Sequence, residues 1–192
     1  MTIASHCSDH YRFIRSWIAD PFRVAAVAPS GEALARLMTR DILPSAGAVL
    51  ELGPGTGAFT RALIARGVRE SDLTLVEFGE EFARILQERF PEARVLQMDA
   101  ARLGKHDLFP GQVVSAVVSG LPILSMPPRK MMAILSAAFS YLCPAGSFYQ
   151  FTYGPRCPVP NPILERMGLK AERIGGTMRN LPPASVYRIS RI

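Results

Sequence analysis

The sequence predicts an α/β fold in which helices cover both faces of a doubly wound, mostly parallel sheet of about seven strands. Three observations carry this prediction. A short apolar run at 49–52 is followed by a glycine turn and a helical pattern. Further short apolar runs alternate with helical patterns, which is typical of right-handed strand–helix–strand units. The run at 113–119 is apolar at nearly every residue, as expected of a central parallel strand buried on both faces.

The segment around the first strand organises the rest of the prediction. Gly53, Gly55 and Gly57 follow this strand and precede a helix predicted over 58–67. Glycine permits positive φ and lets a ligand approach the backbone closely. Free N–H groups at the start of the helix favour a carboxylate or a phosphate. A strand, a glycine loop and a helix N-terminus in this order indicate a nucleotide-cofactor site.

Three acidic residues stand at the ends of the first three predicted strands. Glu51 lies inside the first strand, where it would repel a pyrophosphate but attract a cationic amino-acid group. Glu77 falls near the end of the second strand, at 73–78, about 20 residues past the glycines, where an acid binds ribose hydroxyls. Asp99 follows the third strand, at 94–98. These intervals are a stronger signal than the glycine loop alone.

The other elements follow from periodicity and turn residues. One helix is predicted to begin at 28–32 and to run to about 42. Further helices are predicted at 79–90, 128–142 and 161–167. After a turn at 144–146, the remaining strands are predicted at 147–153, 169–177 and 185–190. Because ligands bind at the carboxyl ends of parallel strands, the expected rim combines the glycine loop and the acids with residues 119–122 and 153–156.

Residues 6–22 predict an amphipathic helix near the N-terminus. Its apolar stripe and flanking cations are Tyr11, Phe13, Ile14, Trp17 and Ile18, with Arg12 and Arg15. Aromatic side chains beside arginines are typical of a membrane interface. The same pattern fits a helix packed across the domain, and a helix that covers the cofactor while its outer residues contact lipid combines both interpretations.

The net charge of +6 is concentrated in the last third of the chain. Residues 128–192 hold nine Lys or Arg and two Asp or Glu, whereas residues 1–127 are nearly balanced. This favours an anionic partner, either nucleic acid or a membrane surface, with a solvated basic face as the alternative. Three widely separated cysteines match neither a disulfide framework nor a zinc site, which fits a reducing cytoplasm. We expect no signal peptide and no membrane span.

The glycine loop and the three acids together resemble the class I S-adenosylmethionine-dependent methyltransferases. The resemblance implies a Rossmann-like sheet with an antiparallel edge hairpin and N-terminal helices. It assigns Glu51 and the glycine loop to the methionine part of S-adenosylmethionine, Glu77 to its ribose and Asp99 to its adenine. The full expected cofactor set is Pro29, Ser30, Glu51, Gly53, Gly55, Thr56, Glu77, Phe78, Asp99, Ala100 and Ser119.

The sequence 120–123, Gly-Leu-Pro-Ile, bears on the methylated group. Methyltransferases that act on adenine or glutamine nitrogens carry Asn-Pro-Pro-Tyr or Asn-Leu-Pro-Tyr at this place. Here Leu121 and Pro122 are kept, but the Asn and the Tyr are absent. The opening strands also resemble ribosomal RNA adenine dimethylases, and this departure argues against their chemistry.

Most of the chain is similar to bacterial phospholipid N-methyltransferases. The segments that carry this resemblance are 27–30, 51–57, 76–77, 98–100, 119–122 and 180–184. It implies successive methylation of phosphatidylethanolamine to phosphatidylcholine, with S-adenosylhomocysteine as the other product. The implied setting is the cytoplasm, at the inner face of the cell membrane, without nucleic acid, metal or an obligate protein partner.

The resemblance divides the chain into an N-terminal segment, 1–30, that covers the cofactor and a methyltransferase domain, 31–192. Tyr153 and Ser119 are the candidate catalytic residues. The candidate substrate and membrane contacts are Tyr11, Arg12, Phe13, Arg15, Trp17, Ile18, Arg156, Arg179 and Asn180. An arginine such as Arg156 would bind the lipid phosphate, and aromatic rings suit the methylated ammonium. The alternatives are a nucleic-acid or protein N-methyltransferase and a binding protein without catalysis.

Overall fold

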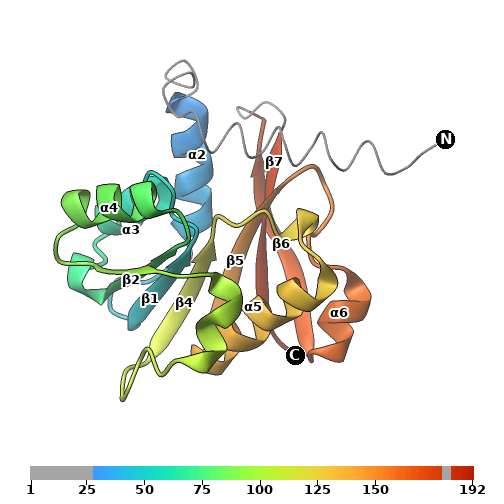
Figure 1. The fold of residues 1–192 in the computed structure, drawn as a ribbon. Coiled ribbons are helices and arrows are strands. Elements are labelled where there is room, and N and C mark those ends of the chain that lie inside the picture. Colours follow the sequence, from blue (N-terminus) through green and yellow to red (C-terminus); the bar gives the residue numbers. More distant parts are fainter. Residues whose placement is uncertain (1–27, 179–182) are drawn as a thin grey trace.

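The computed structural model describes residues 28–178 and 183–192, with side chains from residue 31 onward. The amphipathic helix predicted at 6–22 lies outside these residues. Seven strands form one sheet in the order β3-β2-β1-β4-β5-β7-β6 (Figure 1). The strands are β1 Ala48–Leu52, β2 Leu73–Glu77, β3 Arg94–Gln97, β4 Val114–Ser119, β5 Leu142–Tyr153, β6 Leu169–Thr177 and β7 Ala184–Arg191. The predicted sheet with an antiparallel edge hairpin is confirmed.

Helices cover both faces of the sheet. The α-helices are α2 Ala28–Thr39, α3 Ala58–Ala65, α4 Glu80–Arg89, α5 Pro128–Tyr141 and α6 Asn161–Arg166. Short 3-10 helices are η2 Glu70–Asp72, η3 Ala100–Lys105 and η4 Ile123–Ser125. One face carries α2, α3 and α4, and the other carries η3, α5 and α6. Within the described ranges, no helix is long and apolar enough to cross a bilayer.

The central strands are buried on both faces, which explains their apolar runs. Val49 belongs to the core that includes Leu63 of α3, whereas Leu50 belongs to the core that includes Ile134 of α5. All four of these side chains are fully buried. Successive strand residues therefore feed two separate hydrophobic cores, as expected for a sheet with helices on both faces.

One edge of the sheet collects the predicted site. Strands β1 to β5 pair in parallel, so their carboxyl ends lie at the same edge. β7 runs antiparallel to both β5 and β6, which brings the end of β6 to this edge as well. We call it the carboxyl edge. It carries the glycine loop after β1, Glu77 at the end of β2, and the loop after β4.

The turn predicted at 144–146 is wrong. These residues belong to β5, which begins at Leu142 instead of Ser147. Val114 of β4 pairs with Leu142, but Ala116 pairs with Ser147, so the intervening residues bulge from the ladder while the strand continues. Proline and glycine are typical of bulges as well as turns, and only the pairing partner distinguishes the two.

Candidate functional site

The glycine loop adopts the conformation expected of a cofactor loop. Gly53, Gly55 and Gly57 have φ values of 67°, 54° and 80°, in the left-handed region that glycine enters without strain. A Cβ atom at Gly55 would meet nothing within 4 Å. The backbone conformation, rather than crowding, therefore requires glycine there. Gly57 is the N-cap of α3, so the loop leads directly into the helix N-terminus.

The Glu77 carboxylate ties the glycine loop to the start of α4. Its Oε2 accepts a hydrogen bond from the Gly55 N–H at 3.1 Å, and its Oε1 accepts one from the Gly79 N–H at 2.9 Å. The side chain is largely buried. Each carboxylate oxygen accepts more than one hydrogen bond. Glu77 can therefore hold the loop and accept hydroxyl groups of a ligand at the same time.

Glu51 is fully buried beneath α3. Its Oε2 accepts a hydrogen bond from the Thr60 hydroxyl at 2.7 Å, and its buried Oε1 has no hydrogen-bond partner among the described residues. Burial raises the pKa of Glu51 to about 7, against the opposing effects of the Thr60 hydrogen bonds and the Arg61 charge. A buried acceptor without a partner is costly, so this oxygen fits a donor brought by a ligand.

Asp99 follows β3 and begins η3. Its Oδ1 accepts a hydrogen bond from the Ala101 N–H at 3.0 Å, and its Oδ2 lies 3.0 Å from Nζ of Lys130. Partial burial acts to raise the pKa of Asp99, but the Ala101 hydrogen bond and the charges of Lys130 and Arg102 outweigh it, so this pKa is lowered. Asp99 is therefore ionised at neutral pH. Sequence analysis did not predict the contact with Lys130, which α5 supplies.

The loop after β4 packs directly on the glycine loop. A Cβ atom at Gly120 would lie 2.5 Å from the Gly53 carbonyl oxygen, and one at Gly53 would lie 2.7 Å from the Leu121 side chain. Ser119, the last residue of β4, is fully buried, and its hydroxyl accepts a hydrogen bond from the Leu121 N–H at 3.3 Å. Ser119 thus stabilises the turn that brings these two loops together.

Gln150 is a site residue that sequence analysis missed. It lies on β5 directly beside Ser119 and is 1% exposed. Its Nε2 donates to the carbonyl oxygens of Leu121 and Phe151 at 3.0 and 2.9 Å. Its buried Oε1 has no hydrogen-bond partner in the described part of the chain. Gln150 is the one amide side chain in the otherwise apolar and aromatic run 148–151, and this pattern could have indicated a buried polar residue.

The two candidate catalytic residues lie on opposite faces of the sheet. Tyr153 packs edge-on against Phe151, on the α3 side, with ring centroids 5.6 Å apart. Ser119 follows Val118, whose side chain also lies on the α3 side, so strand alternation places Ser119 on the α5 side. Burial raises the pKa of Tyr153 to about 12, and its hydroxyl is therefore neutral at physiological pH. The structure does not bring these two side chains together.

The remaining predicted cofactor residues lie along the same edge. Phe78 is 75% exposed beside Glu77, whereas Ala100 is buried beside Asp99. The Thr56 carbonyl accepts hydrogen bonds from Arg61 and Arg89. Pro29 and Ser30 belong to the first turn of α2.

The predicted substrate and membrane contacts are mostly beyond the described part of the chain. Arg156 is exposed in the loop after β5. The predicted contacts outside the described residues are Tyr11, Arg12, Phe13, Arg15, Trp17, Ile18, Arg179 and Asn180.

Comparison with known proteins gives a family to this arrangement. A family model described as a methyltransferase domain matches residues 49–146. The chain is also 30% identical over 188 residues to an ornithine lipid N-methyltransferase from Singulisphaera acidiphila, a match covering 93% of this chain and 94% of the relative. The chain belongs to the class I S-adenosylmethionine-dependent methyltransferases. This methyltransferase is also 41% identical over 66 residues to the ribosomal RNA small subunit methyltransferase A of Parabacteroides distasonis. This match covers 33% of this chain and 24% of that enzyme.

Solved structures confirm the class I fold of this methyltransferase. A glycopeptide N-methyltransferase complexed with S-adenosylmethionine superposes with a TM-score of 0.62 at 15% identity, over 84% of this chain and 94% of that one. Magnesium protoporphyrin IX methyltransferase from Synechocystis, with bound S-adenosylmethionine, gives 0.64 at 16% identity, over 98% and 92%. At these identities the likeness describes the fold, and the predicted sheet is confirmed by it.

The residues of this methyltransferase fit S-adenosylmethionine. The unpartnered Oε1 of Glu51 suits the ammonium of the methionine part, and Glu77 retains acceptor capacity for ribose. Gly55 leaves open space above the loop. These three residues lie at one edge of the sheet.

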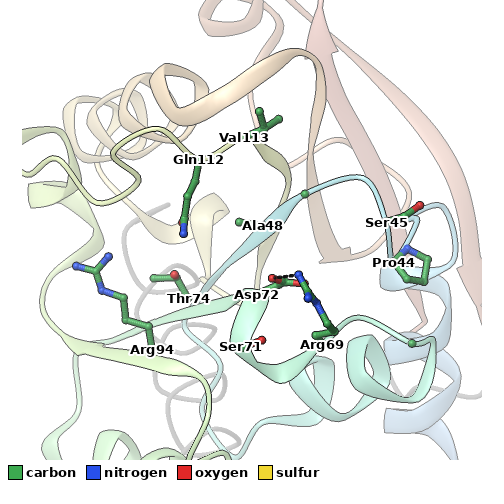
Figure 2. A pocket seen from close by; sticks show the side chains of 12 residues that line it. Pro44, Ser45, Ala48, Arg69, Ser71, Asp72, Thr74, Arg94, Gln112 and Val113 are labelled. Carbon is green, nitrogen blue, oxygen red and sulfur yellow. Dashed lines mark hydrogen bonds and ion pairs between the residues drawn. The ribbon is translucent and has the colours of Figure 1, made fainter.

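A separate surface pocket of about 680 Å³ lies at the amino ends of the strands, opposite the carboxyl edge (Figure 2). Its lining includes Arg69, Thr74, Arg94 and Gln112. Arg69 pairs with Asp72 at 2.7 Å, and Arg94 donates to the Leu108 carbonyl at 2.6 Å. Its arginines are therefore engaged within the fold, and we place the methyltransferase site at the carboxyl edge.

Proposed function

We propose that this methyltransferase adds methyl groups to the headgroup amine of phosphatidylethanolamine and of its mono- and dimethylated forms, giving phosphatidylcholine at the membrane surface. The observation that carries this proposal is the likeness to a lipid N-methyltransferase over nearly the whole length of both chains. The matches to ribosomal RNA small subunit methyltransferases A, in contrast, cover between 33% and 48% of this chain.

The position of Gly120 supports an aliphatic amine over adenine. Gly120 stands where adenine methyltransferases carry an Asn that grips a planar nitrogen. In this structure any side chain at that position would collide with the Gly53 carbonyl oxygen, 2.5 Å from the Cβ position. The two loops are packed too closely to accept the Asn without moving. A neutral aliphatic amine is a strong nucleophile, so it does not need such a clamp.

The carboxyl edge supplies binding and orientation. Glu51 and Glu77 would hold the methionine and ribose parts of S-adenosylmethionine, and Asp99 the adenine. The cofactor supplies an electrophilic methyl group on its sulfonium. Orienting the amine toward that methyl group can contribute about 7–11 kcal/mol to catalysis. Ser119 and Gln150 hold the Leu121 backbone from both sides, and so fix the loop nearest the transferred group.

We assign the lipid contacts to the residues that the sequence predicts for them. Arg156 is exposed beside β5 and would bind the phosphate, together with Arg179. Tyr153 would line the amine pocket as a neutral ring, which fits a substrate that becomes a bulkier cation with each methyl group. The N-terminal stripe from Tyr11 to Ile18 would add contacts to the membrane interface.

Ornithine lipid is a second candidate substrate, because the full-length relative is an ornithine lipid N-methyltransferase. Both candidates present an aliphatic amine on a membrane lipid.

Product analysis by mass spectrometry tests the proposal. The purified full chain would be incubated with methyl-labelled S-adenosylmethionine and vesicles containing phosphatidylethanolamine, with parallel samples of ornithine lipid and of ribosomal RNA. We expect labelled mono-, di- and trimethylated phosphatidylethanolamine, and severalfold less label with Glu77→Ala at a cofactor concentration near the Kd of the wild type. Label confined to ornithine lipid would refute phosphatidylethanolamine as the substrate and identify ornithine lipid in its place. Label confined to RNA would refute a lipid substrate.

A further inference from the structure

We propose that one half of the carboxyl edge is a docking surface for anionic lipid bilayers. We call it the docking half, and define it by two exposed apolar residues, Leu124 and Met178, and two exposed arginines, Arg129 and Arg156. The choice of a lipid surface as partner rests on the proposed function. The assignment of the face rests on the placement of these four side chains.

Large apolar side chains are exposed at the ends of two strands of the docking half. Leu124, in η4 after β4, is 62% exposed, and Met178, directly after β6, is 84% exposed. Burying such side chains in water-free surroundings is favourable, so their exposure on the same edge points to a partner. Phe78 is exposed as well, but we assign it to the cofactor.

Strand register places Met178 on the outer rim. Thr177 of β6 pairs with Ala184 of β7, and Ala184 also pairs with Tyr153, the last residue of β5. The end of β6 is therefore level with the end of β5. β4 ends before β5 does, because its last residue, Ser119, pairs with Gln150, whereas β5 continues to Tyr153. Met178 thus stands on the part of the edge that a flat surface would reach first.

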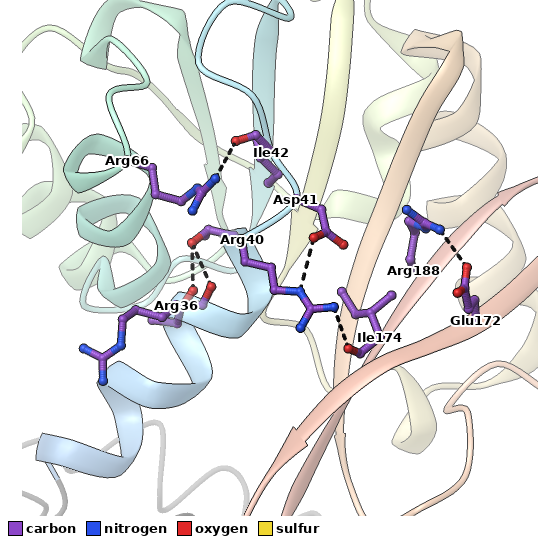
Figure 3. A network of polar contacts seen from close by, with 10 residues as sticks. Arg36, Arg40, Asp41, Ile42, Arg66, Glu172, Ile174 and Arg188 are labelled. Atoms are coloured by element: carbon purple, nitrogen blue, oxygen red, sulfur yellow. Dashed lines mark hydrogen bonds and ion pairs between the residues drawn. The ribbon is translucent and has the colours of Figure 1, made fainter.

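The arginines of the docking half are available to an anionic partner. Arg129, in the first turn of α5, and Arg156, after β5, are exposed, and neither forms an ion pair with any residue described by the structure. In contrast, Figure 3 shows Arg40 paired with Asp41 and Arg188 paired with Glu172. Arg36 likewise pairs with Glu32.

The other half of the carboxyl edge carries charges of both signs. Glu80 and Glu81 are exposed at the start of α4, next to β2, whereas Arg61 and Arg89 donate to the Thr56 carbonyl of the glycine loop. The last third of the chain, which supplies Arg129 and Arg156, holds nine Lys or Arg and only two Asp or Glu. This excess of positive charge favours an anionic bilayer as the partner of the docking half. Arginine near an anionic membrane raises binding roughly fivefold per residue at low salt, whereas apolar insertion persists at high salt.

Sedimentation of the full chain with vesicles tests the docking half. The vesicles would contain phosphatidylglycerol, with pure phosphatidylcholine vesicles for comparison. The test variant is Leu124→Ser with Met178→Ser. The matched control is Leu43→Ser with Val113→Ser, because these side chains are 63% and 58% exposed at the opposite edge. A second test variant, Arg129→Gln with Arg156→Gln, leaves the apolar residues in place.

We expect the apolar test variant to bind anionic vesicles about tenfold more weakly at both low and high salt, and the control to bind like the wild type. The arginine variant should lose about tenfold or more at low salt and little at high salt. All variants should bind S-adenosylhomocysteine normally in calorimetric titration, which shows that they are folded.

Equal sedimentation of the apolar test variant, its control and the wild type would overturn the docking half, whatever the enzyme methylates. Failure of the proposed function is distinguishable, because it is read from methylation of a soluble short-chain phosphatidylethanolamine. Vesicle binding that needs Leu124 and Met178, without methylation of any lipid, would refute only the proposed function.

Discussion

The Glu77 carboxylate holds two loops in place, because it accepts hydrogen bonds from the Gly55 and Gly79 N–H groups at the same time. Glu77→Ala removes both hydrogen bonds and the proposed ribose contacts. Hydrogen bonds to a charged group contribute about 1.5–3 kcal/mol each, so we expect at least a tenfold loss of affinity for S-adenosylhomocysteine in calorimetric titration. Far-ultraviolet circular dichroism should show an intact fold. Unchanged affinity would remove Glu77 from the cofactor site.

Glu51 makes the stability of the fold depend on pH. Burial raises its pKa from 4.5 to about 7, so the folded state binds this proton more tightly than the unfolded state does. The stabilisation linked to the bound proton is fully present below pH 4.5 and is lost as the pH rises through about 7. A shift of this size corresponds to a free-energy change on the order of 3 kcal/mol.

Glu51→Gln should remove this pH dependence. Relative to the wild type, we expect the free energy of unfolding of the variant to rise by about 3 kcal/mol between about pH 4.5 and pH 8. Urea denaturation at each pH measures it, and Glu92→Gln, on an exposed carboxylate, is the control. A constant difference between Glu51→Gln and the wild type across this range would contradict the raised pKa.

At the scale of elements, the carboxyl edge depends on contact between the loops after β1 and β4. Gly120→Ala would place a Cβ atom 2.5 Å from the Gly53 carbonyl oxygen, so one loop must move. Overpacking of this kind costs about 1–3 kcal/mol, and we expect it to weaken S-adenosylhomocysteine binding as well, because Gly53 belongs to the cofactor loop.

Gly104→Ala is the matched control for this loop contact. A Cβ atom at Gly104 would meet Ala137 at 3.5 Å, an ordinary contact distance. Chemical denaturation and calorimetric titration should therefore separate the two variants. Equal stability and affinity for both would mean that the packing of Gly120 against Gly53 is not required by the site.

At the scale of the whole molecule, the cofactor should stabilise the folded domain against unfolding, because its proposed contacts join residues of β1, β2 and β3 that come together only in the folded state. A ligand at about 100 times its Kd stabilises the folded state by about 2.7 kcal/mol. For a domain of this size, that corresponds to a rise in Tm of roughly 5–10 °C. Differential scanning calorimetry with S-adenosylhomocysteine measures this rise. Glu77→Ala should lose most of it at the same ligand concentration, and no rise in the wild type would contradict the site.

The sequence by itself determined the sheet, the glycine loop and the edge on which the site lies. Apolar periodicity reports burial of neighbouring residues, and positive φ is a local property of glycine, so both can be read without knowing distant contacts. The placement of Glu51, Glu77 and Asp99 at one edge then follows from parallel strand direction alone.

Only the tertiary structure decided which side chains meet across that edge. The contact of Gly120 with Gly53, the ion pair of Lys130 with Asp99 and the hydrogen bond of Gln150 to Leu121 each join segments far apart in the chain. Strand register and helix placement determine such contacts, and neither is encoded in the spacing of residues within one segment. Ser119 and Tyr153 were predicted on one rim because both stand at the carboxyl ends of strands, whereas the pleat of β4 and β5 places their side chains on opposite faces of the sheet.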